Sequence, residues 1–192
     1  MVKLKIYVFR HGQTTFNRDE KFTGFIDAKL TKLGVRQAKI IAKKLKNKKF
    51  QVAIHTRLSR SGDTLKEVIK YHPECIRLIK DDRMIERGYG RLSGKSHKWA
   101  IKKYGLEQYN KWHRGFRDRP PGGESFADVE KRVESFIKDL IKFMKKEKVN
   151  VAISASGNSI RLFRKIMERA SEKETCSWII PYDTYFEYTI NS

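Results

Sequence analysis

Short apolar segments that alternate with helical patterns are the feature that most constrains the fold of this chain. Four segments, Lys5–Phe9, Gln51–Ile54, Cys75–Ile79 and Val149–Ser154, have the length and composition of buried strands, and Thr184–Ile190 alternates between apolar and other residues. Strands that alternate with helices favour a sheet whose strands run mainly parallel, with helices on both faces. The sequence therefore predicts an α/β fold, a three-layer α/β/α sandwich.

Helical spacing of apolar residues fills the intervals between these strands. Ser125, with Asp128 three residues later, resembles a capping box, which marks the start of a helix that reaches Met144. Gly105 interrupts a helical pattern between Lys95 and Lys111. The remaining predicted helices are Thr31–Leu45, Ser59–Tyr71 (ended by Pro73) and Gly157–Met167.

Length and composition indicate one globular unit. At 192 residues without a linker, repeat or low-complexity stretch, we expect residues 1–192 to form a single domain. No run of 18 apolar residues is present, and the N-terminus begins with a strand pattern rather than a signal peptide. Cys75 and Cys176 have no nearby partner in the sequence, which favours a reducing, cytoplasmic location over a disulfide scaffold or a zinc site.

The chain is strongly basic, with 43 Lys and Arg against 22 Asp and Glu, a formal net charge of +21. Such an excess is typical of nucleic-acid binding, but it also suits a site for small phosphorylated anions or a solvated surface. The basic residues are spread along the chain, and no nucleic-acid motif accompanies them. We therefore expect no sequence-specific nucleic acid as a partner.

Polar groups with chemical capability follow three of the predicted strands. Arg10 and His11 follow the first strand and Arg60 follows the second. In parallel sheets, sites form beyond the carboxyl ends of the strands. Arg suits bidentate phosphate contacts, imidazole can accept a phosphoryl group, and Glu86 adds an acid. Residues alone thus indicate a phosphate-handling site.

Six sequence blocks follow one another in order along nearly the whole chain. They are RHGQT at 10–14, FTGFID at 22–27, LSR at 58–60, ERGYG at 86–90, WHRGF at 112–116 and GNSIR at 157–161. Together they resemble the histidine phosphatase superfamily, most closely its cofactor-dependent phosphoglycerate mutases. The resemblance implies their fold, a phosphohistidine intermediate and 2,3-bisphosphoglycerate as phosphoryl donor, without a metal.

The resemblance also implies roles for individual residues. His11 would be the phosphorylated nucleophile, Arg10 and Arg60 would neutralise the transferring group, and Glu86 would be the general acid and base. The substrate's phosphate and carboxylate would be held by Asn17, Thr23, Gly24, Arg87, Tyr89, Lys98, Arg114 and Asn158.

The chain departs from the family pattern at four places. Ser156 stands where the family has its second catalytic His, so a hydroxyl replaces a group that can carry charge. His97 aligns with a family Lys, with Lys98 close enough to substitute, and His113 replaces an Arg. The segment around 120–123 is also short, which would leave the site more open to water.

Three accounts of Ser156 stay open at this point: an engineered change, a natural slower or inactive homologue, or a rescue by another residue such as His55. Accordingly, three functions remain in competition. The first is a mutase that interconverts 3-phosphoglycerate and 2-phosphoglycerate. The second is a phosphatase that uses the same phosphohistidine, and the third is a silent protein that binds phosphorylated ligands. We expect a small phosphorylated metabolite as partner and no membrane, and a homodimer is left open.

Overall fold

The fold is seen in a computed structural model that describes residues 2–191. A five-stranded sheet has the order β3-β2-β4-β1-β5. Its strands are β1 (Lys3–Arg10), β2 (Val52–His55), β3 (Arg77–Lys80), β4 (Val151–Ala155) and β5 (Tyr185–Asn191). The first four run parallel, and only β5 pairs antiparallel, at the edge beside β1. The predicted α/β architecture is confirmed.

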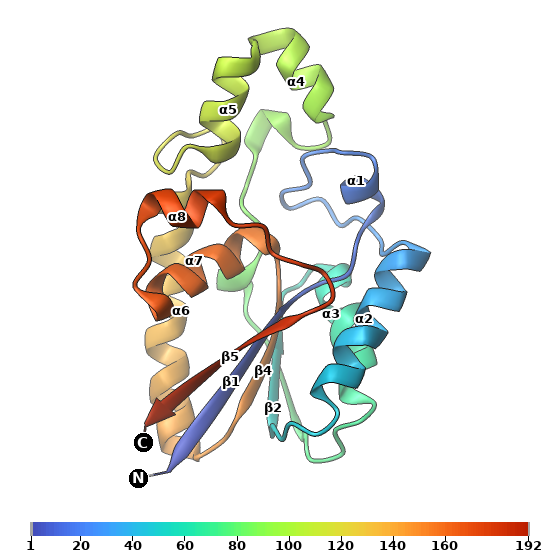
Figure 1. Ribbon diagram of the computed structural model, residues 1–192, viewed down its shortest axis with the longest axis vertical. Coiled ribbons are helices and arrows are strands. Elements are labelled where there is room, and N and C mark those ends of the chain that lie inside the picture. Colours follow the sequence, from blue (N-terminus) through green and yellow to red (C-terminus); the bar gives the residue numbers. More distant parts are fainter. Residues whose placement is uncertain (1, 192) are drawn as a thin grey trace.

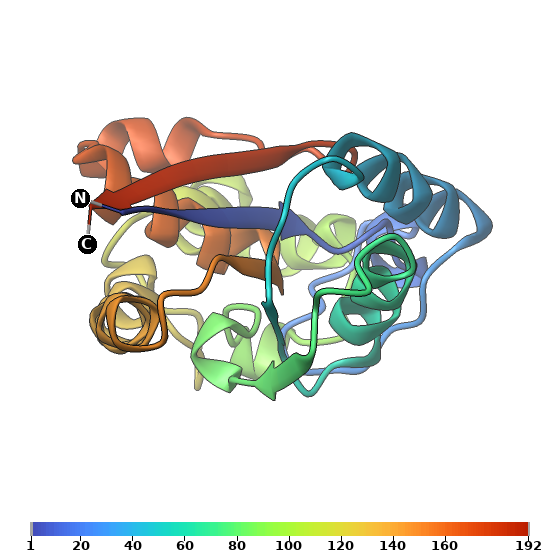
Figure 2. The ribbon, with the colours of Figure 1, turned by 90° about the horizontal axis from the view of Figure 1, so that it is seen from below.

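Helices cover both faces of the sheet (Figures 1 and 2). On one face, α2 (Lys32–Leu45) and α3 (Ser59–Ile69) pack on alternate strand residues such as Tyr7 and Phe9. On the other face, α6 (Phe126–Glu147) and α7 (Gly157–Glu168) pack on Ile6 and Val8. Because successive strand residues point to opposite faces, each apolar strand contributes to two cores. This is why the strands read as continuous apolar runs.

The remaining elements lie beyond the carboxyl ends of the strands or connect the layers. Figure 1 shows α4 and α5 above the sheet, with α1 and α8 nearby. The helices are α1 (Thr15–Arg18), α4 (His97–Tyr104), α5 (Leu106–Arg114) and α8 (Glu172–Ser177), and the 3-10 turns are η1 (Asp82–Met84) and η2 (Gly90–Leu92).

Two helix signals in the sequence are confirmed. The Ser125 hydroxyl accepts from the Asp128 amide, and the Asp128 carboxylate accepts from the Ser125 amide, which completes the capping box of α6. Gly105 separates α4 from α5 with φ +82 and ψ 158, a conformation open almost only to glycine. The interruption predicted there is therefore a break between two helices.

The third strand begins later in the chain than predicted. The segment 75–79 was expected to be the third strand, but β3 covers Arg77–Lys80. The Cys75 amide instead donates to the His72 carbonyl in a turn. Since β3 lies at the sheet edge and is largely exposed, burial does not impose an apolar pattern that would mark its ends.

Candidate active site

The carboxyl ends of β1 and β4 meet at one edge of the sheet. Arg10 pairs with Ala155, and the His11 amide donates to the Ala155 carbonyl at 3.1 Å. The residues that follow these strands, His11 and Ser156, are therefore neighbours although 145 positions separate them. Gly12 permits the turn after β1, because a Cβ there would lie 2.2 Å from the Gly34 carbonyl oxygen.

His11 is held as a neutral ring whose Nε2 carries the lone pair. Its Nδ1 lies 2.8 Å from the Gly12 carbonyl oxygen, and the Arg60 guanidinium donates through Nε to His11 Nε2 at 3.2 Å. Since a guanidinium only donates, Nε2 is the acceptor and Nδ1 carries the proton. Burial, with Arg60 and Arg10 nearby, holds the pKa of His11 well below 6.5. The ring is thus ready to act as a nucleophile near neutral pH.

Arg60 is almost fully buried beside His11. Its guanidinium also donates to the carbonyls of Ile26 at 2.8 Å and Gly24 at 3.0 Å. These bonds aim the side chain, and burial lowers the pKa of its guanidinium. Gly24, predicted to contact substrate, instead contributes a backbone carbonyl that orients Arg60.

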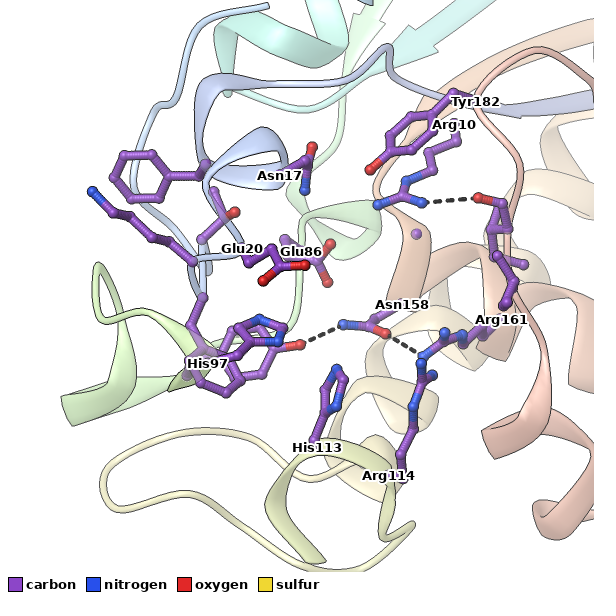
Figure 3. Close-up of a pocket in the computed structure, with 18 residues that line it drawn as sticks. Arg10, Asn17, Glu20, Glu86, His97, His113, Arg114, Asn158, Arg161 and Tyr182 are labelled. Atoms are coloured by element: carbon purple, nitrogen blue, oxygen red, sulfur yellow. Dashed lines mark hydrogen bonds between the residues drawn. The ribbon is translucent and has the colours of Figure 1, made fainter. Parts of the chain in front are cut away.

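A cavity of about 350 Å³ is lined by Arg10 and Gly157, the chain neighbours of His11 and Ser156 (Figure 3). His11, Arg60 and Ser156 are themselves buried and do not line it. Both charge signs line it, and the cations are in excess. Its polar lining comprises Arg10, Asn17, Glu20, Lys21, Thr23, Glu86, Tyr89, His97, His113, Arg114, Asn158, Arg161 and Tyr182. The predicted residues Arg10, Asn17, Thr23, Glu86, Tyr89, Arg114 and Asn158 are therefore brought together around one space.

Glu86 and Arg10 both line this cavity (Figure 3). Glu86 is 8% exposed, and its Oε1 accepts from the Arg87 amide at 2.7 Å. Arg10 donates to the Ile180 carbonyl at 2.8 Å and lies 3.9 Å from the centre of the Tyr182 ring. Arg10 Nε is buried and has no partner among residues 2–191. A carboxyl group and a cation with one unpaired donor thus line the same cavity.

The sequence comparison gives the family. The sequence model of the histidine phosphatase superfamily (branch 1) matches residues 6–185. The chain belongs to the histidine phosphatase superfamily. Its similar relatives in sequence include phosphoglycerate mutases.

Among curated relatives of this superfamily member are two mutases. It is 32% identical over 169 residues to the 2,3-bisphosphoglycerate-dependent phosphoglycerate mutase of Cytophaga hutchinsonii, covering 88% of this chain and 79% of the relative. It is 36% identical over 157 residues to the phosphoglycerate mutase of Schizosaccharomyces pombe, covering 79% and 74%.

Solved structures share the superfamily fold. A putative alpha-ribazole-5'-P phosphatase from Escherichia coli superposes with a TM-score of 0.84 at 20% identity, covering 98% of this chain and 91% of that one. The mycobacterial glucosyl-3-phosphoglycerate phosphatase gives the same TM-score, identity and coverage. At this identity the likeness establishes the fold alone.

Ser156 occupies the place where the superfamily pattern led us to look for a second His. Its side chain is fully buried, and its hydroxyl has no hydrogen-bond partner within residues 2–191. It is also the N-cap of α7, where the first amides of the helix lack intrahelical acceptors. A hydroxyl donor and a helix N-terminus therefore lie together at the carboxyl end of β4, a pairing of groups that suits an anion.

His55, considered as a substitute for the missing imidazole, is engaged elsewhere. Its Nδ1 lies 2.8 Å from the Thr56 carbonyl oxygen, and the ring faces Gly62 of α3. It does not line the cavity. These contacts give no support to a rescue by His55.

Besides Gly24, two residues expected to bind substrate do not line the cavity. Arg87 is fully buried, its guanidinium donates to the Trp112 carbonyl, and it lies between the rings of Tyr89 and Phe126. Lys98 is exposed at the start of α4. Because consecutive helical side chains point in different directions, only one of His97 and Lys98 can face inward. His97 does, with its ring stacked on Phe22 at 4.4 Å.

The sequence reasoning missed several cavity residues, above all Arg161. It lies one helical turn after Asn158 on α7, so the helix face that the two residues share could have indicated it.

His97 and His113 replace family cations as neutral rings: burial lowers the pKa of His97, and burial with Arg114 lowers that of His113 to about 3. Tyr182 comes from the segment before β5, which no motif marked.

Two absences hold for the part of the chain that the structure describes. Between residues 2 and 191, no three His, Cys, Asp or Glu side chains come together as a metal site would require. No described helix combines the length and the apolar character needed to cross a membrane.

Proposed function

We propose that this protein transfers phosphoryl groups through His11, as a 2,3-bisphosphoglycerate-dependent phosphoglycerate mutase that interconverts 3-phosphoglycerate and 2-phosphoglycerate. The observation that carries the proposal is the neutral His11 ring, whose Nε2 accepts a hydrogen bond from a buried arginine. Phosphoryl transfer depends on positioning and on neutralising charge, and this arrangement offers both.

Each half-reaction uses the same two side chains. His11 Nε2 would attack phosphorus as the bond between phosphorus and the substrate oxygen breaks, and Glu86 would donate a proton to the leaving oxygen. In the second half-reaction, the acceptor hydroxyl oxygen would attack phosphorus as the bond between His11 Nε2 and phosphorus breaks, and Glu86 would take the hydroxyl proton. Arg10 and Arg60 would offset the charge on the phosphoryl oxygens, and Ser156 would donate one hydrogen bond.

The cavity suits a polyanionic phosphoryl donor. Arg10 Nε and Ser156 Oγ are buried donors without partners among the described residues, and Lys21, Arg114 and Arg161 add positive charge. The phosphoryl group that primes His11 would come from 2,3-bisphosphoglycerate, the donor named for the mutase relatives. We further propose a cytoplasmic protein that acts on small metabolites, with a homodimer as its candidate assembly.

A phosphatase that uses the same phosphohistidine is the second candidate. Ser156 favours it, because weaker control of the phosphohistidine would allow water to compete with the acceptor alcohol. Product analysis separates the two: a mutase yields 2-phosphoglycerate from 3-phosphoglycerate, whereas a phosphatase releases glycerate and inorganic phosphate. Binding of 3-phosphoglycerate without formation of either product would indicate a catalytically inactive protein that binds phosphorylated ligands.

The deciding experiment is detection of acid-labile phosphate on His11 after incubation with 2,3-bisphosphoglycerate. Mass spectrometry should locate the label on His11 and lose it in His11→Ala, while His55→Gln, a matched change at the neighbouring strand end, should keep it. A label that survives His11→Ala, or no label in the unaltered protein, contradicts the proposal.

A further inference from the structure

Asp27 ends the FTGFID block at 22–27, yet its side chain does not line the cavity and takes no part in the proposed chemistry. The residue is exposed on the loop that leads from α1 to α2. One oxygen of its carboxylate, Oδ1, accepts from the Ser59 amide and from the Ser59 hydroxyl, both at 2.8 Å. An exposed carboxylate is thus committed to a single residue that lies 32 positions away in the chain.

Ser59 is the first residue of α3, and this helix has no cap of its own. Its N-cap residue is Leu58, whose side chain forms no capping hydrogen bond. The amides of a first turn have no acceptor inside the helix, and the helix dipole favours a carboxylate near them. Asp27 therefore caps α3 from a different part of the chain.

Arg60 is the second residue of α3, and the same loop binds its guanidinium. Nη1 donates to the Ile26 carbonyl at 2.8 Å, and Nη2 donates to the Gly24 carbonyl at 3.0 Å. The remaining nitrogen, Nε, donates to His11 Nε2 at 3.2 Å. The loop at 24–27 thus contacts the side chain of this arginine through two carbonyls and its helix through the cap.

These two contacts restrain different parts of Arg60. The carbonyls fix the end of the guanidinium relative to the loop, whereas the cap fixes the backbone of α3 relative to the same loop. The position of Nε depends on both, because Nε lies between the backbone and the end of the side chain. The 3.2 Å separation from His11 Nε2 is at the long end of the usual range for a protein hydrogen bond, so a small displacement of α3 would break it.

The charge of Asp27 is a second and separable influence on Arg60. Burial lowers the pKa of the Arg60 guanidinium, and the carboxylates of Glu86 and Asp27 raise it. An asparagine at position 27 would retain the acceptor oxygen and lose the charge. Comparison of asparagine with alanine at this position therefore isolates the capping bonds.

We infer that Asp27 is a positioning residue, whose hydrogen bonds to Ser59 hold the start of α3 where Arg60 can donate to His11 Nε2. This inference rests on the proposed function, in which His11 is the nucleophile, and it gives Asp27 a part in the reaction without contact with substrate. Loss of the capping bonds would leave the transferring group without a fixed cation. A misplacement of about 1 Å can cost up to about 10²-fold in rate.

The NMR signal of the Arg60 Nε–H proton reports the hydrogen bond to His11 in the ligand-free protein. The signal is identified by its loss in Arg60→Lys. A proton bonded to the His11 ring resonates apart from the protons of exposed arginines, and a loss of stability that leaves the protein folded does not move it. Asp27→Ala removes the acceptor and should move the signal toward those of exposed arginines. Asp27→Asn retains the acceptor and should leave the signal in place.

The single-turnover rate of His11 phosphorylation by 2,3-bisphosphoglycerate measures the consequence for the reaction. Asp27→Ala should lower this rate by roughly 5–100-fold, the range expected of a small misplacement. Asp27→Asn should keep it within about twofold, because Asn and Asp are equivalent as helix caps. Asp63→Ala is the matched control: it removes a carboxylate from the exposed pair with Lys66 on the same helix and should change the rate by less than about twofold.

An Arg60 signal that stays in place in Asp27→Ala overturns the inference. Equal shifts in Asp27→Ala and Asp27→Asn also overturn it, because the charge and not the capping bonds would then position Arg60. If the melting temperature shows that Asp27→Ala does not fold, Ser59→Ala takes its place. That variant loses one of the two bonds and should move the signal by a smaller amount, and an unchanged signal contradicts the inference.

Failure of the proposed function is distinguishable from failure of this inference. If His11 of the unaltered protein is not labelled, the proposed function is wrong, and the Arg60 signal still decides whether Asp27 positions that side chain. If His11 is labelled at the same rate in Asp27→Ala and in the unaltered protein, phosphoryl transfer through His11 stands and the inference is wrong.

Discussion

At the scale of single residues, the candidate site depends on which protons its side chains carry. His11 is neutral because burial and two arginines oppose its protonation, and Arg60 fixes the lone pair on Nε2. In the proposed function, Ser156 would donate a hydrogen bond but no charge to the transferring group. The missing charge should slow the reaction mainly in the transition state, when charge redistributes among the phosphoryl oxygens.

An imidazole at position 156 should accelerate phosphoryl transfer. We expect Ser156→His to raise the rate of His11 phosphorylation by roughly 10²–10³-fold, the usual effect of one transition-state donor. Ligand affinity should change far less, because several charged donors share the binding. Single-turnover labelling and equilibrium binding measure the two effects separately. If the added ring leaves the rate unchanged, Ser156 is not the limiting position.

Phosphorylation of His11 should depend little on pH near neutrality. An ordinary histidine would lose half of its nucleophilic form at pH 6.5, but the pKa of His11 lies well below that value. The labelling rate, measured from about pH 8 down to about pH 6, should not show a loss of half its value at the ordinary histidine pKa. A titration midpoint near 6.5, assigned to His11, would contradict the neutral ring seen in the structure.

The half-buried His113, which lines the cavity from α5, should make the fold sensitive to acid. The pKa of His113 is 6.5 in the unfolded chain and about 3 in the fold. Between these values the unfolded state binds more protons, so stability falls as pH falls, by at most about 1.4 kcal/mol per pH unit. Urea unfolding at several pH values should give a shallower slope for His113→Gln. An identical slope would show that His113 is protonated in the fold.

At the scale of elements, α4 and α5 line one end of the cavity, and Gly105 supplies the backbone conformation that joins them. Gly105 joins α4 to α5, and these helices carry His97, His113 and Arg114. A small apolar cluster that includes Phe22, Tyr89 and Tyr109 ties the pair to the rest of the site. The angle between α4 and α5 therefore affects the outer end of the cavity.

Replacing this glycine should destabilise the helix pair. We expect Gly105→Ala to cost on the order of 1–3 kcal/mol, because an L side chain is strained at φ +82 even though no atom lies within 4 Å of its Cβ. Urea unfolding and hydrogen exchange of α4 and α5 measure the effect. Asn110→Ala, at an exposed position of α5, is the control and should change stability by less than about 0.5 kcal/mol. Equal stabilities of the two variants would show that the backbone there relaxes freely.

At the scale of the whole molecule, the dominant property is the net charge of +21. Exposed ion pairs such as Lys66 with Asp63 and Lys138 with Glu134 neutralise only part of the basic surface. A positive surface attracts anionic metabolites, and it also attracts any polyanion.

Binding to nucleic acid should therefore be electrostatic and without sequence preference. Two unrelated duplexes of equal length should bind with affinities within about threefold, and both affinities should fall by at least about tenfold between 50 and 200 mM salt. Fluorescence anisotropy measures both. Tight binding to only one duplex at physiological salt would contradict this expectation.

By itself, the sequence determined the layers of the fold and the motif residues that follow its strands. Apolar runs such as Lys5–Phe9 and the capping box at Ser125 are local signals, set by burial on both strand faces and by backbone hydrogen bonds. Ordered motifs then indicated His11, Arg60 and Glu86, because residues after parallel strands meet at one edge. The bounds of the edge strand β3 were predicted wrongly, because β3 is largely exposed and burial does not impose an apolar pattern there.

Only the tertiary structure decided which side chains face the cavity. Arg87 and Lys98 belong to motif blocks, yet one is enclosed by aromatic rings and the other is exposed, while His97 and Arg161 face inward. Side-chain direction depends on helix phase and on neighbours that are remote in the chain, such as Phe22 for His97 and Arg114 for Arg161. The same packing sets the proton on His11, because burial and the Arg60 contact exist only after β1 and α3 have come together.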